Sequence, residues 1–165
     1  MEKGTGMNAT TLNPGEIDSH LRLMRIMTVA ALVSIAVAIG VVVFVSPRAG
    51  VASPLAVTLA CAGAALWIGF TANRDAQVRL DRVKRAFAAD GDLQHLLRGH
   101  RMVHLTVLAR LEVMVVAAVV AGVWGRGSAA VWGILALAAM MMVLTWPTAD
   151  KTDMLIQRAR EQRGR

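Results

Sequence analysis

The chain has 165 residues, a mass of 17.6 kDa and a net charge of +7; 56% of its residues are hydrophobic and only 18% are charged. A soluble domain carries about 25% charged residues, so this composition fits a soluble globular domain poorly, and its apolar content excludes a disordered chain. The length allows one domain, and we expect an integral membrane protein with its polar residues concentrated in a few segments.

Residues 1–25 are expected to form a cytoplasmic N-terminal tail and a short helix. Asn13 is placed to act as an N-cap, Pro14 occupies the first turn, and Glu16 stands where a capping-box carboxylate belongs. A secretory signal peptide is not predicted, because the first apolar run begins only at Ile26 and is too long for one.

Four segments are predicted to cross the membrane, at about residues 26–45, 51–70, 103–124 and 128–146. At about 1.5 Å per residue, a helix of about twenty residues covers the roughly 30 Å hydrocarbon core. Three of these segments contain no charged residue, whereas the third contains Arg110 and Glu112. The region 26–146 is therefore predicted to be a four-span membrane domain.

The basic residues orient this domain. Residues 1–25 contain three Lys or Arg, 71–102 contain seven and 147–165 contain five, whereas the two short connectors contain only Arg48 and Arg126. Four spans thus place fifteen basic residues in the cytoplasm and two outside, as the positive-inside rule requires, and three spans would destroy this asymmetry. We predict an all-α integral membrane protein, a four-transmembrane-helix bundle with both termini in the cytoplasm.

The excess of fifteen Arg over three Lys, with abundant Ala and Val, hints at a GC-rich bacterial genome. Together with the charge distribution, it places the protein in the bacterial cytoplasmic (inner) membrane as a multi-pass protein.

The cytoplasmic loop 71–102 is expected to form an amphipathic helical hairpin. One arm has apolar residues at helical spacing, Gly91 is placed to stop that arm, and Asp92 is placed to cap the next. The basic C-terminal tail, 147–165, is expected to be helical from about Asp150 to Gln162.

Small residues recur at every fourth position in several spans, and such spacing lets two helices approach closely in lipid. The second span contains Ala52, Ala56, Ala60 and Ala64, and the third contains Ala117, Ala121 and Gly125, with Ala118 and Gly122 beside them. We expect these residues to pack the spans within one bundle, and a self-association face is the alternative.

Arg110, Glu112 and Ser34 are the candidate intramembrane polar site. A charge within the bilayer costs roughly 2.5–3.5 kcal/mol on insertion scales, so it usually has a function or a partner. Positions two apart on a helix point about 200° away from each other, so at least one of the two charges should face another span or a second subunit. Ser34 lies at the same depth in the first span, and both charged side chains also have the length to snorkel to the cytoplasmic interface.

His100 and His104 are candidate interfacial histidines that share one helical face just before the third span. A zinc site would need further ligands, and neither an H-E-x-x-H motif nor a cysteine pair supplies them, so no metal site is predicted. Membrane haem usually needs axial histidines on two spans, whereas these lie at the cytoplasmic edge; no cofactor is predicted.

The partners predicted from these features are an anionic lipid surface and another membrane protein or a second copy of this chain. The basic loop lacks aromatic residues other than Phe87, so nucleic acid is not predicted as a partner. Anionic lipid headgroups are the simpler partner for basic residues beside a span.

Catalytic motifs are missing from the sequence, and the connectors are too short to form an outer domain. The leading hypothesis is therefore a non-catalytic accessory or scaffold subunit of a larger membrane complex. The alternative is a homo-oligomeric channel or transporter that uses Arg110 and Glu112. A weaker alternative is a redox subunit that binds haem or quinone near His100 and His104.

Overall fold

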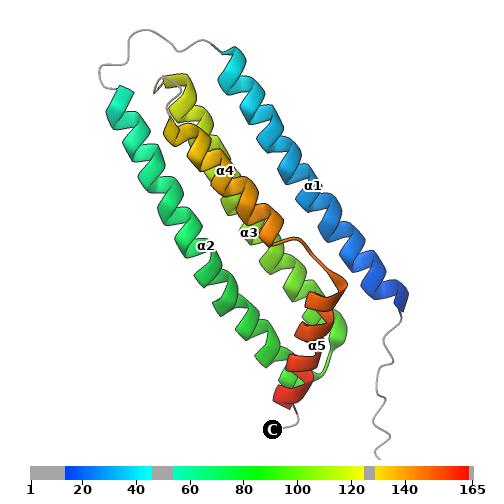
Figure 1. The fold of residues 1–165 in the computed structure, drawn as a ribbon. Helices are drawn as coiled ribbons and strands as arrows, with labels where there is room; N and C mark the ends of the chain where they lie inside the picture. Colours follow the sequence, from blue (N-terminus) through cyan, green and yellow to red (C-terminus); the bar gives the residue numbers. More distant parts are fainter. Residues whose placement is uncertain (1–13, 46–53, 125–128, 164–165) are drawn as a thin grey trace, which may run out of the picture.

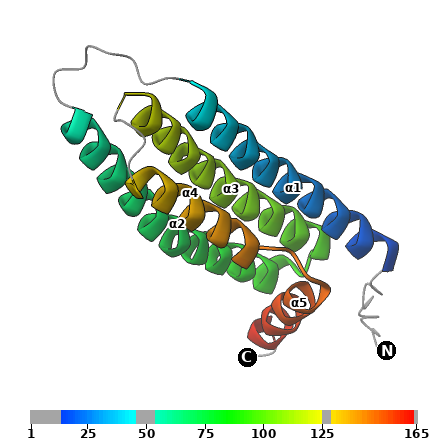
Figure 2. The same ribbon diagram turned by 45° about the horizontal axis from the view of Figure 1, so that its top comes forward.

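The computed structural model describes residues 14–45, 54–124 and 129–163, and all regular structure in these ranges is helical. Five helices follow one another along the chain: α1 (Pro14–Phe44), α2 (Pro54–Asp90), α3 (Leu93–Trp124), α4 (Ala129–Leu144) and α5 (Ala149–Arg163). The first four lie side by side as a bundle, and α5 lies at the end of the bundle where α2 ends and α3 begins (Figures 1 and 2).

Local sequence signals explain where these helices begin and end. Helix α1 begins at Pro14 as predicted, whereas the Asn13 cap and the Glu16 side chain lie outside what the structure describes. Helix α2 ends before Gly91, whose φ of 71° is in the left-handed region and whose N–H donates to the Phe87 carbonyl at 2.8 Å. Asp92 then caps α3, because its Oδ1 accepts a hydrogen bond of 2.9 Å from the backbone N–H of Gln94.

The hairpin expected at residues 71–102 is not a separate unit. Helix α2 has 37 residues and α3 has 32, so at about 1.5 Å per residue both are much longer than the roughly 30 Å hydrocarbon core. Each runs unbroken from the apolar region into the polar region, and the two arms of the hairpin are the ends of these helices.

Three of the described helices, α1, α2 and α3, are long and apolar enough to cross a membrane. Helix α4 has 16 residues and is followed, after a short break, by α5 at an angle of 62°; counting this bent pair as one span gives four crossings. Lys151 holds the break together, because its Nζ donates to the carbonyls of Leu144 and Trp146 at 3.0 Å each.

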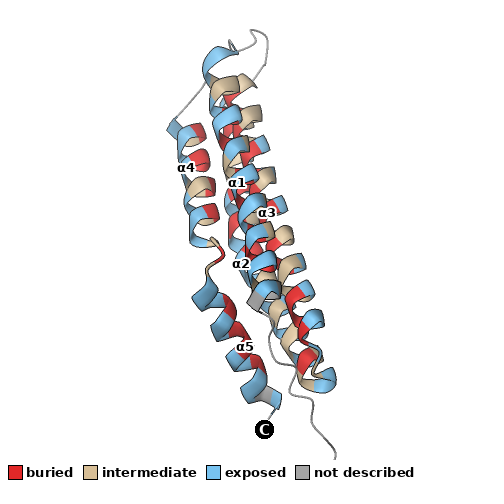
Figure 3. Ribbon diagram, turned by 90° about the vertical axis from the view of Figure 1, so that its right-hand side faces the viewer, coloured by how far each residue is buried: buried red, intermediate tan, exposed pale blue. Residues whose placement is uncertain are grey.

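Helix α3 lies at the centre of the bundle and packs against α1, α2 and α4. Its buried side chains, among them Leu111, Met114 and Ala118, meet Ile35 of α1 and Leu135 of α4 in one hydrophobic core. The faces of α1 and α4 that point away from α3 are exposed and apolar, as a lipid-facing surface requires (Figure 3).

A second, smaller core lies at the end of the bundle where the predicted C-terminal helix docks. Ile156 and Ala159 of α5 are buried against Phe87 of α2 and Leu96 of α3, and Ile17 of α1 packs against the same group. The buried stripe of α5 faces the other helices (Figure 3), so the C-terminal helix is part of the fold.

Glycine allows close helix approach at two points. A Cβ at Gly99 of α3 would lie 2.5 Å from Cγ1 of Val83 in α2, and a Cβ at Gly122 would lie 2.8 Å from Cγ2 of Val42 in α1. Gly122 lies one turn from the buried Ala118, so in α3 the small residues do pack spans together as predicted.

In α2 the same prediction is wrong. Ala56, Ala60 and Ala64 are exposed, and a Cβ at the neighbouring Gly63 would meet nothing within 4 Å; Ala52 lies outside the described residues. The physical reason is that α2 contacts α3 through its other face, which carries the buried Ala65 and Ala72.

Gly99→Ala should destabilise the protein, because the added methyl group must displace Val83 at the α2–α3 contact. Overpacking of this kind costs about 1–3 kcal/mol, which exceeds the gain of about 1 kcal/mol from replacing a helical glycine by alanine. The measurement is the thermal unfolding midpoint in detergent. Gly63→Ala is the matched control and should leave the midpoint unchanged or raise it; a similar loss in both variants would contradict the close approach.

Candidate functional site

Glu112 of α3 faces α1, where Ser34 meets it. Ser34 Oγ lies 2.8 and 2.7 Å from the two carboxyl oxygens of Glu112, and 2.7 Å from the carbonyl oxygen of Ala31. The Ser34 hydroxyl has only one hydrogen to donate, so the Glu112 carboxyl oxygens and the Ala31 carbonyl oxygen compete for it as acceptors. Within the described ranges, no cationic side chain forms an ion pair with Glu112.

Arg110 faces α2 instead. Its Nη2 donates to Oδ2 of Asp75 at 2.5 Å, and the two partly exposed side chains form an ion pair between α3 and α2. Asp75 lies beyond the predicted end of the second span, so the arginine reaches an acidic residue outside the predicted spans. Because side chains on α3 tilt toward its N-terminus, this is also the direction that snorkelling predicts.

The structure therefore brings Glu112 and Ser34 together and places Arg110 on the other side of α3. Residues two apart on a helix point in nearly opposite directions, which is why the two charges take partners on different spans. Each interaction joins α3 to a neighbouring helix, Glu112 to α1 and Arg110 to α2. The three residues form two separate contacts, one with α1 and one with α2.

A double-mutant cycle on Arg110 and Asp75 should reveal this ion pair. Asp75→Leu leaves the arginine without its anionic partner and should cost about 1 kcal/mol, and Arg110→Met should cost a similar amount. The double variant should recover most of the loss because neither charge remains. Reversible unfolding by titration with a denaturing detergent measures the four free energies, and strictly additive single losses would contradict the coupling.

His100 and His20 meet between α3 and α1. His20 Nε2 lies 3.4 Å from His100 Nδ1, and the two ring centroids are 5.6 Å apart. His20 is buried, and it comes from a segment eighty residues earlier in the chain.

His104 packs one turn further along α3 and contacts Thr28 of α1. Thr28 Oγ1 donates to the Met24 carbonyl at 2.9 Å and lies 3.0 Å from His104 Nε2. Because the threonine hydroxyl donates its hydrogen to that carbonyl, we assign Nε2 of His104 as the donor to the hydroxyl oxygen. Both side chains are buried, so this contact is a satisfied polar pair inside the bundle.

The histidine pair lies outside the predicted spans, in the parts of α1 and α3 that precede them. Burial, and to a smaller extent the neighbouring imidazoles of His20 and His104, lower the pKa of His100 to about 4. Burial also lowers the pKa of His20, with Arg101 as the second cause. Both imidazoles are therefore neutral at pH 7. No three His, Cys, Asp or Glu residues of the described chain converge as metal ligands.

The stability of the protein should fall as the pH is lowered from about 6.5 toward 4. His100 binds its proton at about pH 4 in the folded state but near its ordinary pKa of 6.5 in the unfolded chain, so acid favours unfolding in this window. The expected loss from His100 at pH 5 is about 2 kcal/mol. Unfolding midpoints between pH 7 and 5 test this, and His100→Gln should flatten the profile. An unchanged slope in that variant would contradict the assignment.

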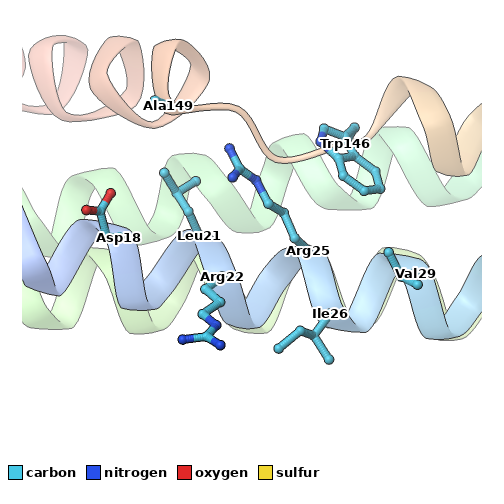
Figure 4. Close-up of a pocket in the computed structure, with 8 residues that line it drawn as sticks. All are labelled: Asp18, Leu21, Arg22, Arg25, Ile26, Val29, Trp146 and Ala149. Carbon is cyan, nitrogen blue, oxygen red and sulfur yellow. The ribbon is translucent and has the colours of Figure 1, made fainter.

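A groove of about 600 Å³ lies between α1 and the connection from α4 to α5. Figure 4 shows Arg25 pointing toward that connection and Arg22 pointing to the other side of α1, with Trp146 near the end of α4. Arg25 Nε also donates to the Pro147 carbonyl at 3.4 Å. Basic residues and tryptophan at one level are typical of a membrane interface.

Three partners were missed by sequence reasoning: Asp75 for Arg110, His20 for His100 and Thr28 for His104. Asp75 falls outside the predicted second span, and only the continuity of α2 carries it to the level of Arg110. For the histidines, the sequence offered one signal: His20 and His100 each come a few residues before a predicted span, on the side predicted to be cytoplasmic.

No family model matches this chain, and neither a curated protein nor a solved structure matches it. The function is therefore argued from the chain's own residues.

Proposed function

We propose that this protein is a non-catalytic accessory or scaffold subunit of a larger membrane complex. In this proposal it lies in the bacterial cytoplasmic membrane, crosses it four times and has both termini in the cytoplasm. The excess of basic residues in 1–25, 71–102 and 147–165 supports this orientation, and so does the position of Arg22, Arg25 and Trp146 at one level.

The observation that carries the proposal is that both intramembrane charged residues have partners inside the bundle. Arg110 is paired with Asp75, and Glu112 accepts a hydrogen bond from Ser34. Charges that line a transport path must be accessible to the transported species, whereas these hold α3 against α2 and α1. The pairs thus favour a structural role and weigh against the channel or transporter alternative.

The exposed small residues of α2 supply the face where another transmembrane helix would dock. Ala56, Ala60 and Ala64 follow one another at every fourth position and are exposed, and a Cβ at the neighbouring Gly63 would meet nothing within 4 Å. In lipid, where apolar surface gives no drive for association, such a face gains its energy from close van der Waals contact.

Gentle extraction from the native membrane should yield an assembly that is larger than one chain and contains a second membrane protein. Ala60→Leu combined with Ala64→Leu should release that partner, because two bulky side chains separate the helix backbones. Ala136→Leu, at an exposed position of α4, is the matched control and should retain it. Native mass spectrometry of the extracted species measures both.

A lone monomer in the native extract would overturn the accessory role. A homo-oligomer would instead support the channel alternative, and flux in proteoliposomes that is lost in Arg110→Ala or Glu112→Gln would establish it. A Soret band in the purified protein would support the haem alternative near His100 and His104; in the structure, His20 and Thr28 already contact these two side chains.

A further inference from the structure

We propose that a pocket between α2, α3 and α5 binds the phosphate group of a doubly charged phosphate monoester. The pocket lies at the cytoplasmic end of the bundle, where α5 docks against the ends of α2 and α3 (Figure 1). It is separate from the polar contacts of Arg110 and Glu112, and the proposal does not depend on the accessory function.

The chemistry of the lining selects an anion. Lys84 of α2 and Lys151 and Arg158 of α5 line the pocket together with His100 of α3, and apolar side chains such as Leu155 form the rest of the wall. None of the described residues that line it is acidic. Three cations from two helices are thus held around one small space, and none of the lining residues offsets their charge.

Each of these cations keeps hydrogen-bond donors for a ligand. The side chain of Lys84 is only 13% exposed, and its one ion pair is with Asp81, at 3.3 Å, whose own side chain is 62% exposed. Lys151 uses two of its three N–H donors on the carbonyls that end α4. Arg158 forms no ion pair among the described residues.

The surroundings of the pocket are also positive. Arg101 and Lys151 are the permanently charged groups that act on the histidines beside the pocket, whereas His20 and His100 are neutral at pH 7. Like charges held close together repel one another, so an anion that enters this space gains their combined potential.

The size and depth of the pocket narrow the ligand class. Its volume of about 280 Å³ is at the lower limit for small-molecule sites, so it suits one phosphate group and is too small to enclose a whole nucleotide. Lys151 reaches the carbonyls of Leu144 and Trp146, so the pocket begins at the level where α4 ends. Basic pockets at this level are suited to lipid headgroups, and a free phosphate monoester from the cytoplasm has the same chemistry.

Binding of a phosphate would also fasten α5 to the bundle. Lys151 and Arg158 come from α5 and Lys84 from α2, so one ligand between them bridges two helices that otherwise meet mainly through the apolar side chains of the smaller core. Lys151 in addition holds the bend after α4, which links occupancy of the pocket to the position of α5.

The test uses the full-length protein with two probes. Inorganic phosphate is titrated into the protein in neutral detergent, and nanodiscs of phosphatidylcholine with phosphatidic acid are compared with discs that contain phosphatidylglycerol, a singly charged diester. Thermal unfolding and native mass spectrometry report binding. Saturable stabilisation by inorganic phosphate assigns a soluble ligand, and selective retention of phosphatidic acid assigns the lipid; either result supports the site.

The variants are Lys84→Gln and Arg158→Gln, which should each weaken binding about tenfold because each removes a charge-assisted hydrogen bond. Arg158→Lys keeps the charge and should retain most of the binding, which separates the site from a folding defect. Arg160→Gln and Arg82→Gln are exposed matched controls on the same two helices and should bind as the wild type does.

Two results would overturn the proposal. One is the absence of binding by both probes. The other is an equal loss in the control variants or equal retention of phosphatidylglycerol, because bulk attraction between a basic surface and any anion would then explain the binding.

Discussion

A charged side chain inside a bilayer must find a partner or reach water, and α3 carries two charged side chains within its predicted span. Arg110 meets Asp75 on α2, and Glu112 meets Ser34 on α1, so the two contacts lie on opposite sides of one helix. An unpartnered charge at this depth costs roughly 2.5–3.5 kcal/mol, which is enough to set the rotation of α3 about its axis. That rotation in turn places the buried face of α3 against α4 and leaves α1 and α2 on either side of it.

Close packing between helices is the second interaction that holds the bundle together. In hydrocarbon, helices associate by van der Waals contact and hydrogen bonds, so positions where backbones approach matter most. Gly122 allows α1 to approach α3 through Val42, and Gly99 allows α2 to approach α3 through Val83. Alanines at every fourth position of α2 are exposed instead, and in the proposed function they form the face for a second membrane protein.

The end of the bundle where α5 docks has a different physical character. Helices α1, α2 and α3 extend past their predicted spans, and α5 folds back on them through Ile156 and Ala159. Because α5 folds back, basic side chains and neutral histidines lie close together in a small volume. The apolar contacts of α5 hold these groups together in spite of their repulsion, and an anion in the pocket would relieve it.

The sequence by itself determined the membrane class, three of the four apolar segments, the helix stop at Gly91 and the cap at Asp92. These features depend on local hydrophobicity and backbone preference, which act within a few residues. It also indicated that Arg110 and Glu112 point to different sides of their helix and that Ser34 lies at their depth, because helical geometry is regular. The role of these residues stays a proposal.

The tertiary structure alone decided which faces of these helices are covered. It paired Arg110 with Asp75 and His20 with His100, it buried the small residues of α3 while leaving those of α2 exposed, and it turned α5 back onto the bundle after α4. Each of these outcomes depends on the rotation and depth of one helix relative to another. The rotation and depth of a helix are set by packing between segments far apart in the chain. The pattern of apolar residues does not reveal them, because in a membrane helix both the lipid-facing side and the protein-facing side are apolar.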